Sequence, residues 1–225
     1  MLKKLFVLFT IVSTVSCNTI IIGDSMFAES PIKNYLEEDT GAIIENYALV
    51  GASLQKGWVK SIPDQYEDIK HLNPSTIIMD GGGNDVMSNL YACQRFNDNC
   101  RNMIDHVSLI ARDLMINMTN NGVKYIVYLG FYYVKGVNKA IDYGSQKLIE
   151  VCNNITNNFN TTLDTTLNTN LRGNSNTSSN YGCYFTDPRN LSIPVGWDGL
   201  HPTVEGYQML SQSIYNTIIS NNITT

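Results

Sequence analysis

Short apolar runs alternate along this chain with longer segments in which apolar residues recur at helical spacing. The runs predict strands at residues 19–22, 42–49, 75–79 and 124–132, and a short edge strand at 183–185. Strands that are apolar on both faces are typical of a parallel sheet covered by helices on both sides. The pattern therefore predicts an α/β fold with a central parallel sheet of about five strands joined by crossover helices.

Three segments between and after these runs carry helical spacing. Residues 102–118 form the first of them, and the second runs from residue 148 to about 171 as one apolar stripe through an Asn/Thr-rich stretch. The third, residues 203–219, opens after Pro202. Residues 172–180 predict a polar loop. With no internal repeat and no linker in view, we expect a single domain over residues 18–225.

The N-terminus has the pattern of a secretory signal. Lys3 and Lys4 precede an apolar stretch at residues 5–15, which is too short to span a bilayer. Small residues at 13–16 suit cleavage near Ser16 or Cys17, so residues 1–17 are predicted to be a signal peptide and the protein to be secreted or periplasmic. Lipid anchoring at Cys17 is an alternative, although the first strand begins only two residues later.

Composition narrows the possible partners. The chain has 225 residues, 43% of them hydrophobic and 16% charged, which suits one globular domain with a sizeable core. A net charge of −5 and the lack of a Lys/Arg cluster argue against nucleic acid as a partner. No segment is long and apolar enough to predict a transmembrane span.

Besides Cys17, the chain has four cysteines, and an even number in an exported protein predicts disulfides. Three pairings are possible. Cys93 with Cys100 would close a small local loop, and Cys152 with Cys183 would bracket the Asn/Thr-rich stretch.

Three candidate residues follow three successive predicted strands. Ser25 follows the first strand, Gly51 the second and Asn84 the third. Ligands of open α/β sheets bind at the carboxyl ends of the strands, so we expect these residues to lie at one edge. Asn84 stands in Gly82-Gly83-Asn84-Asp85, where its amide can donate to an oxyanion. Alternatively, this segment is a glycine-rich turn capped by Asn84, and Gly51 is a structural loop glycine.

A carboxylate three residues before a histidine, in Asp198-Gly199-Leu200-His201-Pro202, suggests the acid and base of a serine hydrolase. The chain has only three histidines. His71 precedes the third strand, at the wrong end for this edge, and His106 lies inside a predicted amphipathic helix. Three histidines without zinc-type spacing argue against a metal centre.

Ser25, in Gly23-Asp24-Ser25-Met26, supplies the candidate nucleophile. Alternatively, Ser25 is only the N-cap of a strand-to-helix turn, and we expect Asp24 to make structural contacts there. No glycine follows two residues after Ser25, so this is not the nucleophile elbow of α/β-hydrolases.

Taken together, the chain resembles the SGNH hydrolases, the GDSL esterase/lipase superfamily. Ser25 matches the family's first block, Gly51 the second, Asn84 the third, and Asp198 with His201 the fifth. Met26 departs from the leucine of the family name, and Gly41 and Gly57 compete with Gly51 for the second block.

The resemblance implies a flavodoxin-like three-layer α/β/α fold and hydrolysis of carboxylic esters or thioesters without a cofactor. It implies that Ser25 attacks the acyl carbon, His201 acts as general base and Asp198 orients His201. The backbone N–H groups of Ser25 and Gly51 and the side chain of Asn84 would form the oxyanion hole. The same fold also allows a non-catalytic binding module, or an acyltransferase that uses the same acyl-enzyme.

The substrate is expected to be a small-molecule or lipid ester, with small-ester, lysophospholipid, thioester and carbohydrate-acetyl classes all open. Aromatic and apolar residues near the predicted edge could line an acyl pocket or stack on a sugar, or they could belong to the core. They are Met26, Phe27, Phe131, Tyr132, Tyr133 and Trp197.

Overall fold

The computed structural model describes residues 18–170 and 181–225, with the backbone alone between residues 159 and 170. The predicted signal peptide, Cys17 and the predicted loop at residues 172–180 lie outside the described residues.

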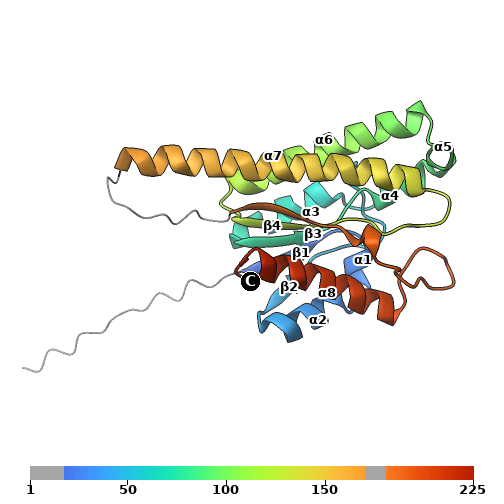
Figure 1. Cartoon of the computed structure of the whole chain (residues 1–225), viewed down its shortest axis with the longest axis horizontal. Helices are drawn as coiled ribbons and strands as arrows, with labels where there is room; N and C mark the ends of the chain where they lie inside the picture. The colour runs from blue at the N-terminus through green and yellow to red at the C-terminus, as the bar shows by residue number, and fades with distance from the viewer. Residues whose placement is uncertain (1–17, 171–180) are drawn as a thin grey trace, which may run out of the picture.

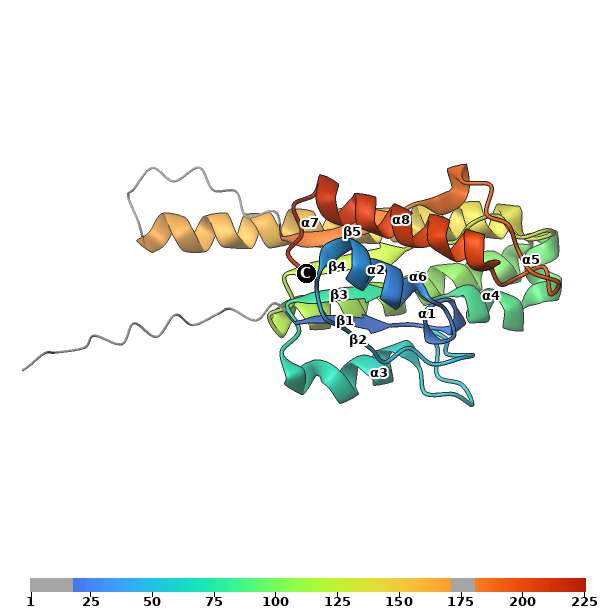
Figure 2. The ribbon, with the colours of Figure 1, turned by 90° about the horizontal axis from the view of Figure 1, so that it is seen from below.

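Five parallel strands form one sheet in the order β2-β1-β3-β4-β5. Their bounds are β1 Thr19–Ile22, β2 Ile44–Asn46, β3 Thr76–Met79, β4 Tyr125–Leu129 and β5 Gly182–Thr186. The predicted parallel sheet of about five strands is confirmed, and β5 lies at an edge as expected. The strands and the helices around them are seen from two sides in Figures 1 and 2.

Two strands are shorter than their apolar runs predict. β2 ends at Asn46, whose side chain accepts a hydrogen bond from the backbone N–H of Ala48 at 3.0 Å. The N–H groups of Tyr47 and Leu49 still donate to the carbonyls of Ile21 and Gly23, so the segment after β2 stays beside β1. β4 ends at Leu129. The prediction that strand four extends to Tyr132 is therefore wrong, and the aromatic residues 131–133 lie in the loop that follows.

The three predicted helices are present. They are α6 Asp98–Asn120, α7 Asn138–Asn170 and α8 Val204–Ser220. α6 begins earlier than predicted because the side chain of Asn97 caps it, accepting from the N–H of Cys100. Short helices that the apolar pattern did not reveal are α1 Ser25–Ala28, α2 Ile32–Thr40, α3 Ile62–Ile69, α4 Gly83–Ser88 and α5 Leu90–Arg95, with 3₁₀ turns at Lys70–Leu72 and Pro188–Asn190.

Alternate residues of each strand point to opposite sides of the sheet and build two cores. Ile20 and Ile22 of β1 pack in one core with side chains of α3, α6 and α7. Ile21 lies between them in sequence and packs in the other core with α1, α2 and α8. Helices therefore cover both faces, as the ribbon shows (Figure 1), and the predicted three-layer α/β/α fold is confirmed.

Two disulfides join Cys93 to Cys100 and Cys152 to Cys183. The first links α5 to α6 across a short turn, and the second links α7 to β5. Of the three possible pairings, the structure has the one that brackets the Asn/Thr-rich stretch. Within residues 18–170 and 181–225, no helix combines the length and apolar content that a membrane span requires.

Candidate active site

Ser25 is the first residue of α1, immediately beyond the carboxyl end of β1, and only 8% of it is exposed. The N-cap of this helix is Asp24, whose Oδ1 accepts from the backbone N–H of Met26 at 2.9 Å. The alternative in which Ser25 caps the helix is therefore wrong, and the structural contacts expected for Asp24 are present. The Ser25 hydroxyl is left to make other interactions.

The turn that presents Ser25 requires glycine at position 23. Gly23 has φ +148°, and a Cβ atom there would lie 1.9 Å from Oδ1 of Asp80. Gln65 of α3 holds the same residue from the other side, since its amide accepts from the N–H of Gly23 and donates to its carbonyl, each at 2.9 Å. The backbone before Ser25 is thus fixed by buried partners.

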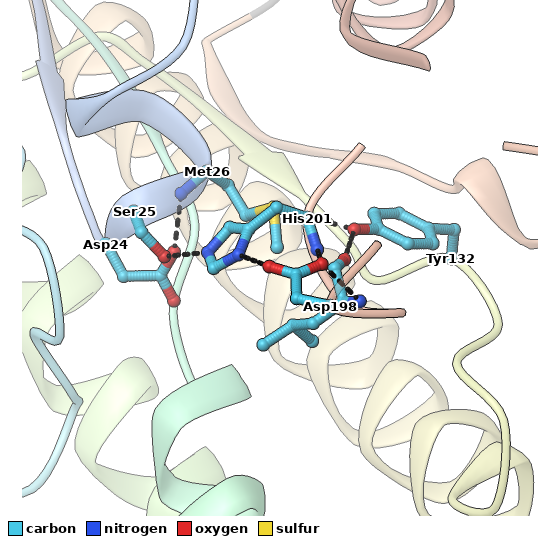
Figure 3. Close-up of polar contacts among 7 residues, drawn as sticks. Asp24, Ser25, Met26, Tyr132, Asp198 and His201 are labelled. Atoms are coloured by element: carbon cyan, nitrogen blue, oxygen red, sulfur yellow. Dashed lines mark hydrogen bonds and ion pairs between the residues drawn. The ribbon is translucent and has the colours of Figure 1, made fainter. Parts of the chain in front are cut away.

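Ser25, His201 and Asp198 lie in one hydrogen-bonded series (Figure 3). Oγ of Ser25 is 2.8 Å from Nε2 of His201, and Nδ1 of His201 is 2.6 Å from Oδ2 of Asp198. Residues that are 176 positions apart in sequence therefore meet at the carboxyl edge of the sheet. The imidazole stands between the hydroxyl and the carboxylate.

Asp198 fixes the direction of these hydrogen bonds. Backbone N–H donation from Leu200, the imidazole of His201 and the N–H of His201 lower the pKa of Asp198 to about 2. An ionised carboxylate only accepts hydrogen bonds, so Nδ1 of His201 must carry a proton. In the neutral imidazole Nε2 is then the free acceptor, and Ser25 donates to it.

Several hydrogen bonds fix the loop that carries His201. The N–H of Gly196 donates to the carbonyl of His201 at 2.7 Å, and the N–H of Thr203 donates to the carbonyl of Pro194 at 2.9 Å. Thr203 also caps α8. The hydroxyl of Tyr132 donates to the carbonyl of Leu200, which links the β4–α7 loop to the residue before His201 (Figure 3).

Asn84 lies in the first turn of α4, beside the loop that contains Gly51. Its amide nitrogen donates to the carbonyl of Ala52 at 2.8 Å and makes a longer contact of 3.4 Å with Oδ2 of Asp24. The N-cap of α4 is Gly82, so Asn84 does not cap this turn. Gly51 has φ +76° and directly precedes Ala52. Asn84 therefore contacts both the Ser25 turn and the Gly51 loop.

Two carboxylates behind these loops were not assigned roles by the sequence pattern. Asp85 accepts from the N–H groups of Leu54 at 2.9 Å and Gln55 at 3.1 Å, and so holds the loop after Gly51. Asp80 is 1% exposed, and its Oδ1 accepts from the N–H of Asp24 at 2.8 Å. Burial raises the pKa of Asp80 well above its ordinary value, and burial also raises that of Asp24.

Ser25 and Asn84 open onto an apolar hollow that is lined by residues of α4, α6 and α7. Of the aromatic candidates, Phe131 and Tyr132 line this hollow. Phe27 is buried in the core between the sheet and α8, and Trp197 is fully exposed.

The other two histidines lie apart from this site. His71 is in the 3₁₀ turn before β3, and His106 is an exposed residue of α6. Among the residues that the structure describes, no three His, Cys, Asp or Glu side chains are grouped as metal ligands.

The sequence profile of the GDSL-like Lipase/Acylhydrolase family matches residues 20–214. Among curated proteins, none matches the sequence of this chain.

Three solved structures share the fold at low identity. The lipase Lip_vut3 from a goat rumen metagenome is 14% identical, with a TM-score of 0.61, over 89% of this chain and 96% of that one. TesA is 12% identical, with a TM-score of 0.60, over 91% of this chain and 99% of TesA. The psychrotrophic esterase EstA from Pseudoalteromonas sp. is 12% identical, with a TM-score of 0.58, over 90% of this chain and 97% of EstA.

Proposed function

Because this chain belongs to the GDSL-like lipase/acylhydrolase family of ester hydrolases, we propose that it is an exported serine esterase that works through an acyl-enzyme on Ser25. The observation that carries the proposal is the hydrogen-bonded series from Ser25 through His201 to Asp198. This is the order of groups that nucleophilic catalysis by serine needs.

In the first half of the reaction, Oγ of Ser25 attacks the acyl carbon of the ester while Nε2 of His201 takes the hydroxyl proton. The tetrahedral intermediate collapses when the bond to the leaving alcohol or thiol breaks. His201 returns the proton to that leaving group, and the acyl group stays on Ser25. Asp198 stabilises the imidazolium that forms between these steps.

In the second half, a water molecule takes the place of the alcohol. His201 accepts a proton from the water as it attacks the acyl-serine, and the same proton returns to Oγ of Ser25 when the carboxylic acid leaves. Every proton in this cycle passes through Nε2, which is why the 2.8 Å contact with Ser25 matters.

Three donors are proposed for the oxyanion: the backbone N–H groups of Ser25 and Gly51 and the amide of Asn84. The N–H of Ser25 lies in the first turn of α1, where helical N–H groups lack an intrahelical acceptor. Asn84 already donates to the carbonyl of Ala52 and, at 3.4 Å, to Asp24. The longer contact is the one that an oxyanion would replace. The cycle uses these groups alone and calls on no cofactor.

Export is part of the proposal. The pattern of a signal peptide at residues 1–17 and the two disulfides support a secreted or periplasmic location, where disulfides persist. The ester substrate would then meet the enzyme outside the cytoplasm.

The direct test is hydrolysis of p-nitrophenyl butyrate by the wild type and by Ser25→Ala, with circular dichroism as the check on folding. We expect a loss of at least about 10³-fold in kcat/KM in a folded variant. A folded Ser25→Ala protein with unchanged activity would overturn the assignment. A wild type that never hydrolyses esters would favour the binding module, and acyl transfer to an added alcohol in preference to water would favour the acyltransferase.

A further inference from the structure

The hollow next to Ser25 has an almost wholly apolar wall. It extends from Ser25 and Asn84 along α4, between α6 and α7, as far as Leu148. Its walls include Met87, Met103, Val107 and Phe131.

The chemistry of this wall limits what can bind there. Among its lining residues only Asp24 bears a charged group, and that carboxylate is occupied in capping α1. The hydroxyl of Ser108 donates to the carbonyl of Asp105 at 2.8 Å, so it is satisfied within its own helix. A sugar would find few polar partners here, whereas a hydrocarbon chain would leave water for an apolar surface.

Size points the same way. The lining of the hollow continues from Ser25 and Asn84, past α4, as far as Leu148 of α7. The methyl group of an acetyl ester would fill only a small part of it. Empty apolar space beside a bound acetyl group contributes no contacts, so longer acyl chains gain more.

We propose that this hollow is the acyl-chain site and that it takes hydrocarbon chains longer than acetyl, with its depth set by Gly144 of α7. The proposal rests on the proposed esterase function, since the acyl group must be attached to Ser25 for the chain to enter the hollow.

Gly144 is the residue that keeps the space between α6 and α7 open. It lines the hollow, and a Cβ atom added there would contact only Cγ2 of Ile104, at 3.7 Å. A glycine within a long helix is unfavourable compared with alanine, and this one has no positive φ that would require it. A larger side chain at this position would project into the hollow and shorten it.

The expected effect follows from the burial of methylene groups. Each methylene that leaves water can raise kcat/KM by about fourfold. We therefore expect kcat/KM to rise by at least about tenfold from acetate to octanoate in the wild type.

The experiment measures kcat/KM on p-nitrophenyl acetate, butyrate, octanoate and palmitate for the wild type, Gly144→Ala, Gly144→Leu and Gln146→Leu. Gln146 is exposed on the same helix, its side chain donates to Glu150, and it does not line the hollow, so Gln146→Leu adds the same side chain outside the hollow. Gly144→Leu should lower the ratio of kcat/KM for octanoate to kcat/KM for acetate by about tenfold or more.

Gly144→Ala should show a smaller shift in the same direction, which keeps the test informative if the leucine variant folds poorly. The control Gln146→Leu should keep the wild-type profile. A wild type that prefers acetate, or a folded Gly144→Leu protein with an unchanged chain-length profile, would overturn the assignment of the hollow.

Calorimetric titration of Ser25→Ala with decanoate separates the two proposals. Binding of decanoate that is lost when Gly144→Leu is added supports the acyl-chain site even if no ester is hydrolysed. Ester hydrolysis by the wild type without binding of decanoate leaves the esterase proposal standing and contradicts the acyl-chain site.

Discussion

The hydroxyl of Tyr132 donates a hydrogen bond to the carbonyl of Leu200, the residue directly before His201. Tyr132 follows β4 and Leu200 precedes α8, so this one contact joins the loop beside the hollow to the loop that carries the imidazole. Tyr132 is 3% exposed, and its hydroxyl also lies 3.7 Å from the sulfur of Met26, the neighbour of Ser25. We infer that this contact positions His201.

The first prediction concerns this contact. Tyr132→Phe keeps the ring but removes the donor to Leu200, so the His201 loop should lose its anchor. We expect kcat to fall by roughly tenfold with KM little changed, because small misplacements of catalytic groups slow the reaction itself. Steady-state kinetics on p-nitrophenyl butyrate separate the two parameters. A rise in KM with unchanged kcat would mean that Tyr132 contacts substrate and does not position His201.

The second prediction concerns Asp198. Asp198→Asn removes the charge that stabilises the imidazolium and disturbs the tautomer of His201, so kcat should fall on the order of 10³-fold to 10⁴-fold. The measurement is kcat for the folded variant. Near-normal turnover by Asp198→Asn would show that another acceptor orients His201.

The low pKa of Asp198, about 2, also sets the sign of a stability effect. A carboxyl group whose pKa is lowered in the folded state stabilises the fold at pH values above its ordinary pKa of roughly 3.9. This stabilisation is lost as the pH falls toward 2. Urea unfolding should therefore show a difference between wild type and Asp198→Asn that shrinks as the pH falls below about 4. A difference that grows on acidification would contradict this direction.

Asp80 should show the opposite dependence. Burial raises its pKa, so the folded protein holds a proton that the unfolded chain gives up as the pH rises above roughly 4. Asp80→Asn keeps an oxygen for the N–H of Asp24 and removes the titration. The stability of the wild type relative to Asp80→Asn should therefore decline as the pH rises above about 4. A pH-independent difference in urea unfolding would mean that Asp80 is ionised in the folded protein.

The disulfides are expected to differ in their contributions to stability. The Cys152–Cys183 pair spans 31 positions and the Cys93–Cys100 pair spans 7. By loop-closure entropy, removing the Cys152–Cys183 disulfide should lower the free energy of unfolding by about 4 kcal/mol, and removing the Cys93–Cys100 disulfide should lower it by about 2.5 kcal/mol. Denaturant unfolding of the two double Cys→Ser variants measures this order. Equal losses would mean that local packing, and not loop length, decides the effect.

The strands of the sheet could be predicted because each one is a short run of apolar residues in the sequence. Ile20 to Ile22 form an unbroken apolar run that is typical of a strand buried on both faces, and β1 lies where the run predicts. The short helices α1, α4 and α5 were not predictable, because four to six residues are too few to show a helical repeat. Their positions depend on turns and caps such as Asp24.

The candidate site likewise contains residues that the sequence predicts and residues that it does not. Ser25, Asp198 and His201 stand in short motifs whose residue types suggest their chemistry, and the structure brings their side chains together. Gln65 and Asp80, which hold the turn before Ser25, carry no such signal, because a buried polar residue is recognisable only from its partners. The hollow was likewise hidden, since it arises where α6 and α7 pack together across Gly144.

The most direct test of Ser25 as the nucleophile is to treat the protein with a fluorophosphonate and map the labelled residue by mass spectrometry of its peptides. We predict one adduct, on Ser25, in the wild type, and no adduct in Ser25→Ala or in His201→Ala, because the hydroxyl reacts only when His201 takes its proton. Labelling of another residue, or full labelling of Ser25 in His201→Ala, would contradict the account.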